Sequence, residues 1–201
     1  KRVTLELGGN DPAVILPDAD IEKITPRIFN AAFSNNGQLC TAIKRVYVHE
    51  SQYEELVAGL AARAQSARVG DGLEDGVRFG PLANAAQRDR IEALVNEAIA
   101  AGARAVTGGR RPDLPGYFYE PTIVADLPEG TALELEEQFG PALPVIAYSD
   151  LDAAVERANS GDYGLGASAW WTDVDAAVRV AERLQAGTVW VNTHNMVDPN
   201  M

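Results

Sequence analysis

The sequence has only one cysteine, Cys40, among its 201 residues. A single thiol cannot form an internal disulfide, so the chain lacks the cysteine framework of small secreted domains and is expected to be cytoplasmic. It also lacks any run of the roughly 20 apolar residues that a membrane-spanning helix needs, and any secretory signal pattern. We therefore expect no membrane partner.

Positive charge is also scarce. Lys and Arg number 17 against 29 Asp and Glu, which gives a net charge of −12. Because neither a basic patch nor an arginine-rich helix is present, the sequence argues against a nucleic-acid partner. The two histidines, His49 and His194, lie far apart, and no Cys/His cluster has the spacing of metal ligands. No metal is therefore expected.

Both ends of the sequence look interrupted. Residues 1–5 begin inside a stretch with strand character, and residues 198–201 end without a helix or strand. The length suits one domain. We interpret residues 1–201 as a single domain of a longer polypeptide.

Short apolar segments alternate with segments of helical periodicity. Strands are expected at residues 3–7, 13–16, 46–48, 103–107, 144–148, 167–171 and 188–192. Helices are expected at residues 21–34, 84–101, 150–159 and 173–185, and one more helix is expected to begin at a Ser51–Glu54 capping box. Loops are expected at residues 70–80 and 108–116. Pro26 is expected only near a helix start or at a break. The alternation predicts an α/β fold, a mostly parallel open sheet flanked by helices on both faces. Ligands of such sheets gather at the carboxyl ends of the strands.

Cys40 is the first candidate for chemistry. It follows the polar, turn-forming stretch 35–38 (Asn-Asn-Gly-Gln), which predicts a position just after a helix end. Backbone N–H groups are free there to bind an oxyanion. A lone cysteine is more often an inert core residue than a nucleophile, so the pattern alone leaves both interpretations open.

Glu6 and a later acidic segment are the other candidates. Glu6 ends an apolar stretch just before Gly8-Gly9, where glycine lets the backbone approach a neighbour closely. Desolvation there would suit a general base, although a solvated glutamate is the simpler interpretation. In the segment 136–141, Glu137 could accept hydrogen bonds from sugar hydroxyls and Phe139 could support a flat ring. A hydrophobic plug beside a turn explains the same residues.

Taken together, five segments resemble the catalytic domain of the NAD(P)-dependent aldehyde dehydrogenase superfamily. They are Leu5-Glu6-Leu7-Gly8-Gly9, Asn36-Gly37-Gln38-Leu39-Cys40, Glu137-Gln138-Phe139-Gly140-Pro141, residues 159–166, and Gln185-Ala186-Gly187-Thr188-Val189-Trp190-Val191-Asn192. They occur in the family's order, and the resemblance covers essentially all 201 residues.

The resemblance implies roles for individual residues. Cys40 would attack an aldehyde to give a thiohemiacetal and then a thioester, and Glu6 would activate the water that hydrolyses the thioester to a carboxylic acid. Glu137 would hold the nicotinamide ribose, Phe139 would pack near the nicotinamide, and the backbone of Leu7 would lie near its carboxamide. The cofactor is expected to be NAD or NADP.

The resemblance also implies what the chain leaves out. Most of the cofactor would bind to an N-terminal domain outside this sequence, and the C-terminal tail would lie outside it as well. The full-length protein is expected to be a homo-oligomer, and the isolated fragment to be inactive. Asn10-Asp11, Leu39 and Ile43-Lys44-Arg45 depart from the family's usual residues, and we expect these positions near the substrate tunnel, where they would affect specificity.

Two other functions stay open. One is a CoA-acylating relative, in which a thiol instead of water resolves the thioester; Glu6 favours hydrolysis, because a positioned base serves water attack. The other is a non-catalytic family member or fragment that acts only as a structural or association domain.

Overall fold

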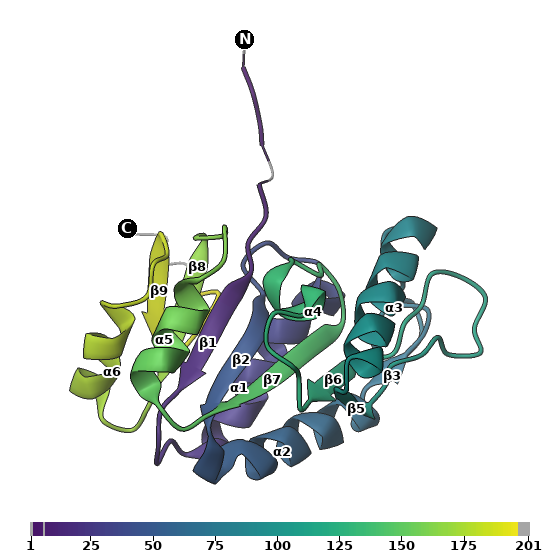
Figure 1. The fold of residues 1–201 in the computed structure, drawn as a ribbon. Coiled ribbons are helices and arrows are strands. Elements are labelled where there is room, and N and C mark those ends of the chain that lie inside the picture. Colours follow the sequence, from purple (N-terminus) through teal and green to yellow (C-terminus); the bar gives the residue numbers. More distant parts are fainter. Residues whose placement is uncertain (1, 6, 197–201) are drawn as a thin grey trace.

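The computed structural model describes residues 2–5 and 7–196. Its main feature is a seven-stranded sheet in the order β5-β6-β7-β2-β1-β8-β9, parallel except for β5 (Figure 1). The strands are β1 (Asp11–Ile15), β2 (Ile43–His49), β5 (Arg104–Thr107), β6 (Thr122–Ala125), β7 (Ala142–Tyr148), β8 (Gly166–Trp170) and β9 (Thr188–Val191). A separate two-stranded sheet joins β3 (Arg68–Val69) to β4 (Val77–Phe79).

Helices cover both faces of the large sheet. They are α1 (Ile21–Phe33), α2 (Tyr53–Ser66), α3 (Ala85–Ala100), α4 (Ala132–Leu135), α5 (Leu151–Asn159) and α6 (Val174–Ala181), with 3₁₀ turns η1 (Ser34–Gly37) and η2 (Glu50–Gln52). Helices α1 and α2 pack on one face, and α3, α5 and α6 pack on the other. The predicted α/β class, with a mostly parallel open sheet and helices on both faces, is confirmed.

Burial on both faces explains the apolar character of the central strands. All five residues of β1 are buried, and alternate side chains face opposite layers. Ala13 and Ile15 contact the α1 and α2 layer, whereas Val14 packs in the opposite cluster. Each fully buried Val or Ile side chain contributes about 2 kcal/mol to stability.

Two local predictions about helices are wrong. Ser51 does not cap α2: it lies within the turn η2, its hydroxyl is 2.8 Å from Nδ1 of His49, and α2 begins without a side-chain cap. Pro26 lies inside α1 without a break. Proline removes one backbone hydrogen bond there, and the buried apolar face of α1, which includes Ile28 and Phe29, compensates for that loss.

The amino ends of the parallel strands form the edge that matters for the candidate residues. Cys40 precedes β2, Glu137 and Phe139 precede β7, and Gly8-Gly9 precede β1. The candidates therefore lie at the amino ends of the strands. This differs from the general rule for open sheets, from which ligands were expected at the carboxyl ends. In Figure 1 residues 2–5, in purple, project beyond this same edge.

The strand expected at residues 3–7 is not formed in the described residues. Residues 2–5 and Leu7 have no strand assignment, and Val3, Leu5 and Leu7 are 71%, 68% and 79% exposed. A strand needs a neighbour to pair its backbone groups, and none of the described strands lies alongside this segment. A second local difference is β4, which forms inside the predicted loop at 70–80.

Candidate active site

Cys40 lies in a turn between η1 and β2, so the predicted position after a helix end is confirmed. The backbone reverses direction through three successive residues with positive φ: Asn35 (49°), Asn36 (59°) and Gly37 (73°). A Cβ on Gly37 would lie 2.3 Å from the carbonyl oxygen of Gly140, so glycine is required at this close approach. The Cys40 thiol is free and partly exposed. This location suits a reactive thiol better than an inert core residue.

The Gly8-Gly9 turn packs directly against the Cys40 turn. A Cβ on Gly9 would lie 2.5 Å from the carbonyl oxygen of Cys40. Gly8 has φ 75°, and its Cβ would lie 2.3 Å from Oε2 of Glu137. The predicted close approach of the glycine backbone is therefore confirmed, and the neighbours are Cys40 and Glu137.

Glu137 completes this group of segments. Its Oε1 accepts a hydrogen bond from the Gly9 amide at 2.9 Å and lies 3.8 Å from Nζ of Lys44. The side chain is 15% exposed, so it is held in place but remains accessible. Residues from positions 8, 9, 40 and 137 thus meet at one edge of the sheet, although 128 positions separate Gly9 from Glu137 in sequence.

Phe139 has an unusual backbone conformation for its residue type. Its φ is 50°, in the left-handed region that non-glycine residues seldom occupy. Gln87 holds the segment by donating to the carbonyl oxygens of Gln138 and Phe139, each at 2.8 Å. Buried Gln138 also donates to the carbonyl oxygens of Lys44 and Ala142. Such strain persists only where surrounding contacts fix it, and it often marks functional segments.

The two remaining site predictions fall on the N-terminal segment. Glu6 lies outside the described residues. Leu7 is described and has an exposed side chain. The roles predicted for the Glu6 carboxylate and for the Leu7 backbone stay predictions.

Lys44 is a charged residue in the interior beside Cys40. Its side chain is 1% exposed, and its ammonium contacts the carbonyl oxygens of Leu39, Cys40 and Ala42. Burial lowers the pKa of Lys44, whereas the negative charges at Glu137, Asp11 and Cys40 act in the opposite direction. Sequence reasoning marked Lys44 as unusual but gave no sign of these contacts.

A second buried group holds the Cys40 turn from another direction. Nε2 of His194 lies 2.8 Å from the carbonyl oxygen of Thr41 and 3.5 Å from Oδ2 of Asp11, and Nδ1 lies 2.9 Å from the hydroxyl of Ser168. The Trp170 indole donates to that hydroxyl at 2.8 Å. Because a carbonyl only accepts, Nε2 carries a hydrogen and donates it to Thr41. The sequence contained no signal for this arrangement, which depends on the tertiary fold.

Burial also changes the interpretation of the departures from the family pattern. Asn10, Asp11, Lys44 and Arg45 are each 1% exposed. Arg45, for example, donates to the carbonyl oxygen of Asn10 at 2.9 Å and to that of Ala158 at 2.8 Å. The side chains at these four positions therefore stabilise the interior. The expectation that positions near the substrate tunnel affect specificity stays a prediction. Leu39 is only partly buried beside Cys40.

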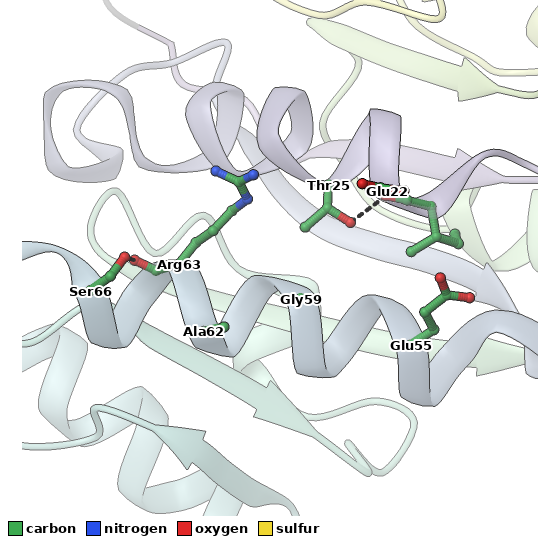
Figure 2. A pocket seen from close by; sticks show the side chains of 8 residues that line it. Glu22, Thr25, Glu55, Gly59, Ala62, Arg63 and Ser66 are labelled. Carbon is green, nitrogen blue, oxygen red and sulfur yellow. Dashed lines mark hydrogen bonds between the residues drawn. The ribbon is translucent and has the colours of Figure 1, made fainter.

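Other features of the described residues do not form a competing site. A groove of about 550 Å³ lies between α1 and α2. Figure 2 shows side chains that line it, among them Glu22, Thr25, Glu55 and Arg63. It contains neither Cys40 nor Glu137. Within residues 2–5 and 7–196, no group of three His, Cys, Asp or Glu side chains is arranged to hold a metal ion. No helix in the same part of the chain is long and apolar enough to cross a membrane.

Comparison with known proteins identifies close similarity to one family. The model of the aldehyde dehydrogenase family matches residues 1–201. The putative aldehyde dehydrogenase DhaS of Bacillus subtilis is 44% identical over 198 residues, covering 98% of this chain and 40% of that protein. The phenylacetaldehyde dehydrogenase of Pseudomonas fluorescens is 44% identical over 203 residues, covering 100% of this chain and 40% of that protein.

Solved structures give the same result. The NAD⁺ complex of aldehyde dehydrogenase from Bacillus cereus superimposes with a TM-score of 0.93 at 37% identity. The match covers 98% of this chain and 40% of that one. The chain therefore spans about two-fifths of the length of the proteins that it resembles.

Proposed function

The chain belongs to the aldehyde dehydrogenase family, and we propose that it is the catalytic domain of an enzyme that oxidises an aldehyde to a carboxylic acid with NAD or NADP. One observation carries this proposal. The only thiol, the double-glycine turn and the Glu137 carboxylate meet at one edge of the sheet. A nucleophile in a partly exposed turn, next to an acceptor for sugar hydroxyls, is what such a reaction requires.

Cys40 is the proposed nucleophile. Its thiolate attacks the aldehyde carbon, and a carbon–sulfur bond forms as the carbonyl π electrons move to oxygen. The Cys40 amide is suited to stabilise that oxyanion, because it donates no hydrogen bond to any residue in the described part of the chain. Loss of hydride from the same carbon converts the thiohemiacetal to a thioester on Cys40.

When bound, NAD or NADP would supply the acceptor for the hydride of the thiohemiacetal carbon. The residues present fit the nicotinamide and ribose end of such a group. The Glu137 carboxylate is fixed by Gly9 yet partly exposed, and a carboxylate only accepts hydrogen bonds, as ribose hydroxyls require. Phe139 offers a partly buried ring in the same segment.

Glu6 is the proposed general base for hydrolysis. It would remove a proton from water as the water oxygen attacks the thioester, and the carbon–sulfur bond then breaks to release the acid and regenerate the thiolate. We further propose a homo-oligomeric, cytoplasmic enzyme in full-length form; the lone free thiol supports a reducing compartment.

Two variants of the full-length protein test this function. Cys40→Ala should abolish aldehyde-dependent cofactor reduction, and retained turnover would remove Cys40 from the mechanism. Glu6→Gln should give a burst of one reduced cofactor per site followed by slow turnover, because the thioester forms but is hydrolysed slowly. An acyl-CoA product on addition of CoA would instead support the acylating alternative.

A further inference from the structure

Lys44 is the least expected charge in the structure. The side chain of Lys44 is 1% exposed, in the second position of β2, whereas that of Lys23 on α1 is 72% exposed. An ammonium group is costly to bury unless several acceptors or an opposite charge surround it. The residues that surround Lys44 therefore indicate why a cation is placed there.

Three of its contacts belong to the turn that carries the thiol. Nζ contacts the carbonyl oxygen of Leu39 closely and lies 3.4 Å from those of Cys40 and Ala42. An ammonium has three N–H donors and no acceptor, so it matches a cluster of three carbonyl oxygens. Lys44 thus closes the 39–42 turn from the interior.

The same ammonium also reaches the segment proposed to hold the cofactor. Nζ lies 3.8 Å from Oε1 of Glu137 and 5.7 Å from the centre of the Phe139 ring. Oε1 also accepts from the Gly9 amide. One cation therefore contacts both the nucleophile turn and the Glu137 segment.

We propose that Lys44 is a positioning residue, whose ammonium fixes the Cys40 turn relative to Glu137 and places a positive charge next to the residue that bears the thiol. Its effect on turnover rests on the proposed function, whereas its effect on thiol reactivity does not. Burial lowers the pKa of Lys44, and the negative charge of Glu137, followed by those at Asp11 and Cys40, acts against that effect, as expected for a cation that contacts these segments.

The test uses the full-length protein and measures alkylation of Cys40 by iodoacetamide, followed by mass spectrometry of the peptide that contains it. Lys44→Met removes the charge and the donors, Lys44→Gln keeps N–H donors without charge, and Lys44→Arg keeps the charge. We expect Lys44→Met to slow alkylation about tenfold, because a neighbouring cation promotes thiolate reactivity. Lys44→Arg should recover most of the rate and Lys44→Gln little of it.

Lys23→Met is the matched control, since it makes the same change at an exposed position and should leave the rate unchanged. Steady-state kinetics provide the second measurement. Lys44→Met should lower kcat and raise the KM of the nicotinamide cofactor, because both Cys40 and Glu137 lose a contact, whereas a purely structural residue would lower only the amount of folded enzyme.

A folded Lys44→Met variant with wild-type alkylation and kinetics would overturn the inference. If Lys44→Met does not fold, equal alkylation rates in the Arg and Gln variants would overturn it instead. Slowed alkylation in a protein that oxidises no aldehyde would support the role of Lys44 while refuting the proposed function, so the two failures can be told apart.

Discussion

Replacing Gly9 by alanine should separate the two closest segments of the candidate site. The added Cβ would lie 2.5 Å from the carbonyl oxygen of Cys40 and 2.8 Å from Oδ1 of Asp11, whereas ordinary contacts begin near 3.4 Å. The backbones must therefore move apart by roughly 0.9 Å. Overpacking of this kind costs about 2 kcal/mol of stability. A displacement near 1 Å at a reacting group lowers kcat by about 100-fold.

The assay is steady-state cofactor reduction with the full-length protein, together with denaturant unfolding to measure stability. Gly72→Ala is the matched control, because no heavy atom lies within 4 Å of the Cβ it would add. It should leave kcat unchanged. If Gly9→Ala retained wild-type kcat and stability, the close packing of the glycine turn on Cys40 would not position the nucleophile, and the reasoning would be refuted.

Two further predictions concern the interior. Glu134→Gln should lower the free energy of unfolding by about 2 kcal/mol in denaturant titrations. The reason is that Glu134 is 1% exposed and its carboxylate accepts hydrogen bonds from Arg157 at 2.6 and 2.8 Å. An unchanged midpoint of the denaturant transition would contradict this prediction. Burial raises the pKa values of Tyr47, Tyr119 and Tyr148 above the ordinary 10.0. The folded chain therefore binds more protons than the unfolded chain above about pH 10, and stability should fall as the pH rises from there. Ultraviolet titration should show these tyrosines ionising only with unfolding, and ionisation in the folded state would contradict the prediction.

The alternation of strands and helices was enough to predict the fold class. Apolar runs such as 13–16 and 144–148 match strands that are buried on both faces, where periodicity and burial agree. Local capping was less predictable. Ser51 has the sequence of a capping box, yet its hydroxyl bonds to His49, because a nearby side chain competes for the same donor and acceptor.

The candidate site was predicted in part. The turn at Cys40 and the glycines at 8 and 9 could be recognised because turn-forming residues have local consequences. The edge of the sheet that carries the site could not be predicted from the sequence. The general rule for open sheets places ligands at the carboxyl ends of the strands. Only the tertiary structure brings Cys40 and Glu137 together at the amino ends. Lys44 and His194 could not be placed for two reasons. Several of their partners are backbone carbonyls, which every residue carries, and their side-chain partners Glu137, Asp11 and Ser168 are distant in sequence.

The contacts of the Cys40 turn have a consistent polarity. The carbonyl oxygens of Leu39, Cys40 and Ala42 contact Lys44, and that of Thr41 lies within hydrogen-bond distance of His194. The Cys40 amide, in contrast, donates to no residue in the described part of the chain. The turn therefore satisfies its acceptors within the protein and leaves a donor beside the thiol. Developing negative charge on a substrate oxygen needs donors that are already oriented and acceptors that are kept away. In the proposed mechanism Lys44 and His194 would serve this need by occupying the carbonyl groups, although neither takes part in bond breaking.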